Sequence, residues 1–172
     1  MPKVFVVVGI VFLSLAASDC AFGQEAMEKD RETARALAGH VELKWQELCA
    51  QKNGIGCTLY ALAAMNGAGY VIKNEAKATS YLRNGCLYGD PNGCRLLGVA
   101  LQLGRGAPVD LAGARSAFEQ ACTGKDAKGC TRLGTMVSGG VGGPADPARA
   151  ELLIAQACAL GDDKACPPKR SD

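Results

Sequence analysis

The 172-residue sequence has few aromatic side chains and a single histidine. Because aromatic residues make up only 5% of it, we expect a core of small and aliphatic side chains, which short stacked helices accommodate better than a sheet. The 19 basic and 17 acidic residues nearly balance, so the charge gives no reason to expect a nucleic acid or an anionic membrane as a partner. His40 alone cannot supply a site of several histidines, and we interpret it as an ordinary helical residue.

Catalytic motifs are also scarce. The sequence contains no Ser-x-x-Lys, and a Ser-His-Asp or Cys-His site would have to use His40. The glycine-rich run at 139–143 lacks the Lys-Ser/Thr that completes a phosphate-binding loop. We therefore interpret this run as a structural loop, and we expect neither a cofactor nor a metal ion.

The one long apolar run lies at the N-terminus. Lys3 precedes the run Val4–Ala17, and Ala21-Phe22-Gly23 has the small residues of a cleavage site. This pattern predicts a secretory signal peptide over 1–23, with the mature chain starting at Gln24, because the run is short for a membrane span. An uncleaved anchor is one alternative. A lipid-modified Cys20 is another, although Asp19 directly before it is unfavourable.

Eight cysteines remain in the mature chain, in four pairs with seven residues between the partners. The pairs are Cys49 and Cys57, Cys86 and Cys94, Cys122 and Cys130, and Cys158 and Cys166. In an exported protein an even number of cysteines at regular spacing predicts disulfides, whereas zinc sites favour two to four intervening residues. The chain-entropy relation gives roughly 2.5 kcal/mol for a bridge that closes so short a loop.

The first cysteines of successive pairs follow one another at 37, 36 and 36 residues, which is the period of a helical solenoid. Other residues keep the same phase. These are hairpin-loop glycines (Gly67 and Gly69, Gly104 and Gly106, Gly140 and Gly142), helix-capping Asx residues (Asn74, Asp110, Asp146) and residues inside the Cys-x7-Cys loops (Asn53, Asp90, Asp126, Asp162). Each unit therefore reads as two antiparallel helices, the first starting near the second cysteine, for example over 94–103.

Within each predicted first helix, three residues share the face that we assign to the core. They are Tyr60, Ala61 and Ala64; Leu97, Gly98 and Leu101; and Leu133, Gly134 and Val137. A second stripe beside this face mixes polar and apolar residues, as a peptide-binding concave surface would. It contains Thr58, Leu62 and Met65; Arg95, Val99 and Gln102; and Thr131, Thr135 and Ser138. An ordinary solvated face is the alternative for this stripe.

The two ends of the array differ from its middle. Leu37, Val41, Trp45 and Leu48 predict a capping helix over 26–50, and Pro167-Pro168 stops the last unit. Leu152, Leu153 and Ile154 are consecutive, so we expect part of the last helix to expose apolar surface. Such a surface could contact a partner or a second copy of the chain. The expected organisation is a signal peptide, the capping helix with the first disulfide turn, three repeats and a tail, over 1–23, 24–56, 57–93, 94–129, 130–166 and 167–172.

The unit Cys94-Arg-Leu-Leu-Gly98…Gly104-Arg-Gly106…Asp110-Leu-Ala112-Gly-Ala114…Ala121-Cys122 resembles Sel1-like repeats, which are relatives of the tetratricopeptide repeat. With a Cys-x7-Cys in every unit, the chain is similar to the cysteine-rich secreted HcpB-like proteins of bacteria over about residues 45–166. The resemblance implies an all-α, right-handed αα-superhelix with one disulfide per repeat. It also implies either a secreted interaction protein or a penicillin-binding protein with weak β-lactamase activity.

The sequence therefore favours a secreted or periplasmic scaffold that binds an unknown protein or peptide and has no membrane span in its mature part. A weak β-lactam hydrolase is the first alternative and rests on the resemblance alone, since no residue matches a catalytic motif. A structural subunit of an envelope complex is the second alternative.

Overall fold

A computed structural model describes residues 39–40, 42–68 and 71–167 of the chain. The chain divides into two compact units, Met1–His40 and Val41–Asp172, and the repeats lie in the second. The predicted signal peptide, Cys20, Gly69 and the Leu37 and Val41 positions of the capping helix lie outside the described residues. Within the described part, no helix is both long enough and apolar enough to cross a membrane.

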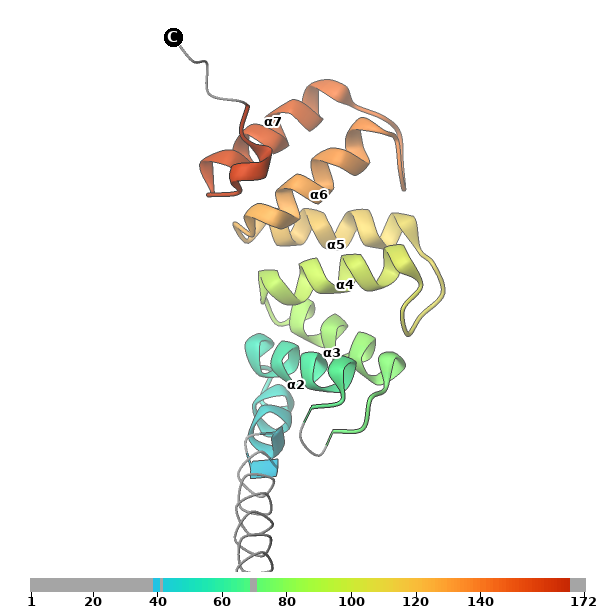
Figure 1. The fold of residues 1–172 in the computed structure, drawn as a ribbon, viewed down its shortest axis with the longest axis vertical. Coiled ribbons are helices and arrows are strands. Elements are labelled where there is room, and N and C mark those ends of the chain that lie inside the picture. Colours follow the sequence, from blue (N-terminus) through green and yellow to red (C-terminus); the bar gives the residue numbers. More distant parts are fainter. Residues whose placement is uncertain (1–38, 41, 69–70, 168–172) are drawn as a thin grey trace, which may run out of the picture. The chain divides into compact units, whose positions relative to one another are not determined.

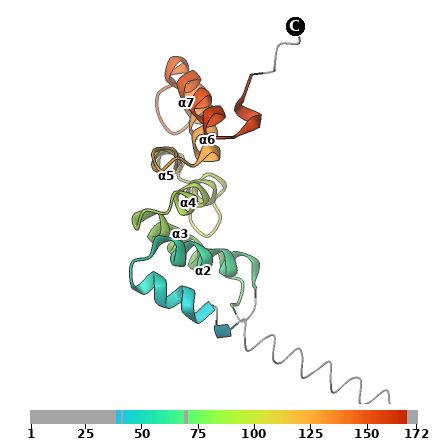
Figure 2. The same cartoon turned by 90° about the vertical axis from the view of Figure 1, so that its left-hand side faces the viewer.

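The second unit is a solenoid of helical hairpins (Figure 1). A helical segment over 42–50 is followed by α2 (Gly54–Asn66), α3 (Glu75–Leu87), α4 (Pro91–Leu103), α5 (Leu111–Thr123), α6 (Ala127–Ser138), α7 (Pro147–Ala159) and the 3₁₀ turn η1 (Asp163–Ala165). The hairpins are α2–α3, α4–α5 and α6–α7, and the second helix of each packs on the first helix of the next (Figures 1 and 2). The described residues form no strand, which confirms the all-α solenoid.

Asx side chains begin the helices, as the sequence predicts. Asn74, Asp110 and Asp146 cap the second helices α3, α5 and α7, each accepting a hydrogen bond from a backbone N–H of the first turn. Asn53, Asp90 and Asp126 do the same for the first helices. Because these caps lie inside the disulfide loop, α4 begins at Pro91, three residues before the Cys94 at which the sequence places its start.

The core forms where small residues let two helices approach each other. All nine residues assigned to the core face of the first helices are buried. A Cβ atom on Gly98 would lie 2.6 Å from the Phe118 ring, and one on Gly134 would lie 2.9 Å from Ile154. The glycine in the middle of the core face is therefore needed for the second helix of the same hairpin to pack closely.

The hairpin loops bind each unit to the one before it. Gly106 has a φ of +69°, and a Cβ there would lie 2.0 Å from the carbonyl oxygen of Glu75, in the first turn of α3. Gly142 repeats this arrangement on Leu111 of α5, with a φ of +71° and a Cβ distance of 2.2 Å. These glycines meet two needs at once, a left-handed backbone and a close approach to the preceding hairpin.

Four disulfides link the last turn of one helix to the first turn of the next, or to η1 at the end. Their Cα–Cα distances lie between 4.3 and 4.8 Å, for the pairs 49–57, 86–94, 122–130 and 158–166. The six cysteines of the first three bridges are at most 6% exposed. Cys158 and Cys166 are less completely covered than these, since η1 is the last element among the described residues.

The loop glycines generate a prediction about stability. Gly106→Ala should lower the free energy of unfolding of the oxidised protein by about 2–5 kcal/mol, from left-handed strain together with the clash on α3. Gly89→Ala is the matched control, because Gly89 has a φ of +82° but no atom lies within 4 Å of the point that its Cβ would occupy. It should lose only about 1–2 kcal/mol. Equal losses in a denaturant titration would contradict the close-approach role of Gly106.

The unequal burial of the bridges predicts the order in which they are reduced. Under native conditions and limiting reductant, the bridge between Cys158 and Cys166 should open first, because a thiolate must reach a sulfur atom to attack it. Alkylation of the freed thiols followed by peptide mass spectrometry measures the order, with the three buried bridges as internal controls. Reduction of a buried bridge first, or of all four together, would show that exposure of the sulfurs does not set the order.

Candidate binding groove

The stripe predicted to bind a peptide lies mostly along the seam between successive first helices, where α2 meets α4 and α4 meets α6. Thr58 is only 2% exposed, and its hydroxyl donates to the carbonyl oxygen of Gly54 over 3.2 Å. Cβ atoms on Gly85 and Gly93 would each lie 2.5 Å from that hydroxyl oxygen, so α3 and α4 enclose it. The prediction that Thr58 binds a partner therefore disagrees with its burial, because no partner can reach its side chain.

Arg95 and Thr131, the equivalent residues in the next two units, join one first helix to the cap of the following element. Arg95 Nε lies 3.3 Å from Asp126 Oδ2, and Asp126 is the N-cap of α6. The Thr131 hydroxyl donates to Asp162 Oδ2 over 2.6 Å, and Asp162 is the N-cap of η1. Both side chains are partly buried, and their polar atoms serve contacts between repeats.

The middle of the stripe is also partly covered in the first two units. Met65 and Val99 pack against the hydrophobic core. Leu62 and Gln102 are partly buried as well. In these two units the stripe is chiefly a contact between repeats, and little of it forms a free concave surface.

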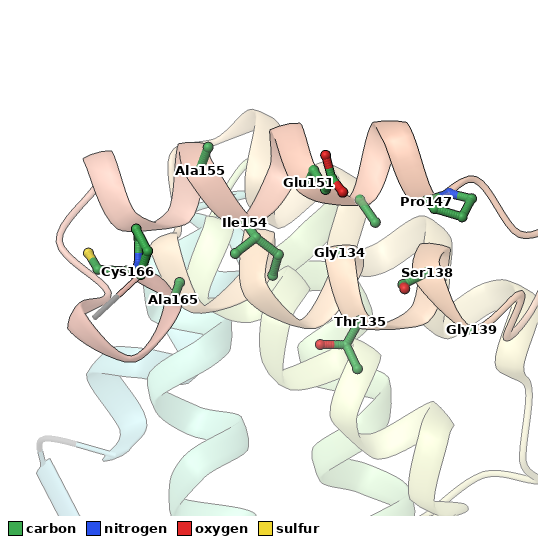
Figure 3. A pocket seen from close by; sticks show the side chains of 12 residues that line it. Gly134, Thr135, Ser138, Gly139, Pro147, Glu151, Ile154, Ala155, Ala165 and Cys166 are labelled. Atoms are coloured by element: carbon green, nitrogen blue, oxygen red, sulfur yellow. The ribbon is translucent and has the colours of Figure 1, made fainter. Parts of the chain in front are cut away.

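In the last unit the same stripe opens onto a groove, because Thr135 and Ser138 are both exposed. The groove has a volume of about 750 Å³ and lies between α6, α7 and the chain after η1 (Figure 3). We call it the terminal groove, and it is lined by Gly134, Thr135, Ser138, Gly139, Pro147, Ala150, Glu151, Ile154, Ala155, Ala165, Cys166 and Pro167. Ala165 and Cys166 lie at one end and Pro147 at the other (Figure 3).

Ile154, which lines this groove, is more exposed than the equivalent residues of the two earlier hairpins. Ile154 is eight residues after its capping Asp, as Phe118 and Leu82 are eight residues after their capping Asx residues. Phe118 and Leu82 are both 0% exposed, whereas Ile154 remains partly exposed. Leu152, on the same helix, is 72% exposed, so the apolar exposure expected of the last helix is present. In α5 the following first helix approaches this position, because Arg132 of α6 lies 5.9 Å from the centre of the Phe118 ring.

Glu151 is the only charged residue among those lining the groove. Its equivalents in the earlier hairpins donate hydrogen bonds to the loop of the next unit: Thr79 to the Arg105 carbonyl over 2.7 Å and Arg115 to the Pro144 carbonyl over 3.0 Å. An ionised carboxylate can only accept hydrogen bonds. Glu151 can therefore bind a hydrogen-bond donor or a cation, whereas Thr79 and Arg115 bind a carbonyl oxygen.

The first hairpin carries a second polar feature on its surface. Tyr60 and Tyr81 pack at a ring-centroid distance of 4.4 Å, and Lys77 Nζ lies 5.2 Å from the Tyr60 ring centre. A side-chain hydrogen bond with Tyr60 raises the pKa of Lys77, and the exposed ammonium remains charged. This cluster holds α2 and α3 together.

The groove lining offers two hydroxyls, on Thr135 and Ser138, and one side chain that could act as a base, Glu151. Within the part of the chain that the structure describes, no hydrogen bond joins the Glu151 carboxylate to either hydroxyl, and Thr135 donates to the carbonyl oxygen of Thr131. His40 is exposed, in the other compact unit. Among the described residues, no group of three or more His, Cys, Asp or Glu side chains could hold a metal ion.

The glycine run at 139–143 forms the hairpin loop in which Gly142 contacts α5.

Comparison with solved structures gives the same fold. A Sel1 repeat protein from Oxalobacter formigenes superposes with a TM-score of 0.66 at 24% identity, covering 72% of this chain and 92% of that one. Helicobacter pylori cysteine rich protein B (hcpB) gives a TM-score of 0.61 at 27% identity, with 77% and 94% covered. The c5321 protein, a protective antigen present in uropathogenic Escherichia coli strains with an SLR fold, gives a TM-score of 0.66 at 25% identity. The match covers 71% of this chain and 26% of that one.

No curated protein sequence matches the chain closely enough to count as a relative. The Sel1 repeat family, however, matches three times, over residues 57–87, 91–126 and 127–162. These matches cover more than half of the chain and coincide with the hairpins α2–α3, α4–α5 and α6–α7. The chain therefore belongs to the Sel1 repeat family.

Proposed function

We propose that this chain is an exported scaffold, held together by its disulfides, that binds a protein or peptide outside the cytoplasm. The observation that carries the proposal is the terminal groove, with its mostly apolar lining and a single carboxylate at Glu151. An apolar groove with few polar groups suits the side chains of a polypeptide, and the polar group fixes its orientation. Sel1 repeats, like other helical solenoids, present such surfaces to other proteins.

The cysteines support the extracytoplasmic part of the proposal. All eight described cysteines are used in bridges that join successive helical elements. Disulfides of this kind persist in oxidising compartments and are rare in the cytosol. A structural neighbour is named as a cysteine rich protein. The apolar run at Val4–Ala17, with a cleavage site ending at Gly23, supplies the route of export.

The scaffold role also agrees with the chemistry of the groove. Hydrolysis of a β-lactam by a serine enzyme requires a hydroxyl activated by an adjacent base. Thr135 donates its hydroxyl hydrogen bond to the backbone carbonyl of Thr131, so no neighbouring side chain activates it. Binding, with no chemical step, is the role that these residues support.

Expression of the full chain with a C-terminal tag in a bacterium that has a periplasm tests the proposal. We expect the protein in the periplasmic fraction, starting at Gln24, with no free thiols under denaturing conditions. Cross-linking there, followed by capture, should yield a partner protein in a fixed ratio. The partner should be lost when the bait is reduced and alkylated, because the repeats then lose the bridges that hold the groove together.

Three results would contradict parts of this proposal. A chain retained in the cytoplasm with free thiols would contradict export. A lipid-modified N-terminal Cys20 would replace the cleavage at Gly23 by membrane anchoring. Hydrolysis of a chromogenic β-lactam by the oxidised protein, abolished by unfolding it, would favour an enzyme over a scaffold.

A further inference from the structure

The terminal groove occupies the position that a first helix fills in every earlier junction between the hairpins. α4 packs on α3 and α2, and α6 packs on α5 and α4. The groove is lined by the corresponding helices of the last hairpin, α7 and α6. It is therefore continuous with an interface that the chain builds twice within its own fold.

The chain begins a helix at this position and then leaves it. Asp162 caps η1 as Asp126 caps α6, and Cys166 is equivalent to Cys130. η1 ends at Ala165, after which Cys166 has an extended backbone and Pro167 follows. Proline has no N–H to continue a helix. The part of the groove left open corresponds to the rest of α6, from Cys130 to Ser138.

The helices that fill the equivalent positions pack between the preceding second helix and the second helix of their own hairpin, and their buried side chains are apolar. α4 buries Leu97, Ala100 and Leu101, and α6 buries Leu133, Met136 and Val137, each at spacings of three and one. This is one face of an amphipathic helix. An occupant with the same apolar face would cover Ile154, at the position where α6 approaches Phe118 with Arg132 5.9 Å from the ring centre.

Charge specifies one end of the occupant. Thr79 and Arg115 donate to the carbonyl oxygens of Arg105 and Pro144, which lie in the hairpin loops two and six residues after α4 and α6 end. Glu151 occupies the equivalent position in the terminal groove and is exposed. A lysine or arginine just beyond the C-terminal end of an incoming helix would therefore lie opposite a carboxylate. A cation there also interacts favourably with the helix dipole.

We propose that the terminal groove binds an amphipathic helix of a partner protein, which docks as a substitute for the missing first helix. Its apolar face covers Ile154 and Ala155, and a basic residue at its C-terminal end pairs with Glu151. The proposal rests on the proposed scaffold function and specifies the partner's chemistry. A second copy of the chain is a poorer occupant, since the described first helices α2, α4 and α6 are already packed in their own solenoid.

Titration of ¹⁵N-labelled full-length oxidised protein with a synthetic peptide taken from α6 and its hairpin loop tests this proposal by NMR. The probe is an acetylated peptide with the sequence of residues 130–142, with Cys130→Ala and two added C-terminal lysines. We expect amide shifts at Thr135, Ser138, Glu151, Ile154 and Ala155, and few elsewhere. A peptide that ends in two glutamates should bind about two- to five-fold more weakly, as befits one exposed ion pair.

Two exposed substitutions provide a matched pair of variants that should both fold. Thr135→Lys places a long charged side chain in the groove and should weaken the lysine-ended peptide about ten-fold or more, as for a central contact residue. Ser116→Lys adds the same side chain at an exposed position of α5 outside the groove and should change the affinity less than about two-fold. Circular dichroism and shift dispersion report whether each variant is folded.

Each other outcome would overturn the inference. Shifts spread over another face, or no binding of the helix at all, would reject the terminal groove as a helix site. Shifts in the groove that depend on protein concentration without peptide, with a doubled mass in solution, would assign the groove to a second copy. If a partner is captured in the periplasm but the helix does not bind the groove, the scaffold function survives and only this inference fails.

Discussion

Each first helix packs on the second helix of the preceding hairpin, and the remaining structure depends on this contact. Small residues bring the two helices together: a Cβ atom on Gly129 would lie 2.7 Å from the Ala121 side chain, and one on Gly93 would lie 3.2 Å from the backbone of Cys86. A disulfide and a capping Asp fix the turn between the helices. In a solenoid each unit contacts only its neighbours, so the stability of the array is close to the sum of such junctions.

The same constraint explains why the end of the array differs from its middle. The residue eight positions after the capping Asx is fully buried in α3 and α5, each of which is followed by a first helix: Leu82 and Phe118 are both 0% exposed. Within the described residues α7 is followed by η1 and by no full helix, and Ile154 and both cysteines of the last bridge are less completely covered. The terminal groove is thus a result of the repeat geometry, and the residue that distinguishes it from an internal junction is Glu151.

Much of the fold could be predicted from the sequence, because period and capping are local properties. The Asx caps, the loop glycines and the core face follow from spacing alone. The structure has them at the predicted residues, apart from Gly69, which lies outside the described residues. The binding stripe could not be predicted in the same way. Periodicity tells which residues share a helix face, but it does not tell what covers that face, and the next first helix encloses Thr58. Glu151 was missed, although a signal exists: it stands five residues after its capping Asp, where Thr79 and Arg115 stand in the other units.

Native-state hydrogen exchange of the full oxidised chain tests most directly whether packing of the following first helix stabilises each second helix. Amides in the middle of α3 and α5 should exchange slowly and with similar protection, since α4 and α6 cover these helices. Those in the middle of α7 should exchange faster than both, because the short turn η1 is the last element described after it. Equal protection in α3, α5 and α7 would contradict the account, since the last hairpin would then be as stable as the covered ones.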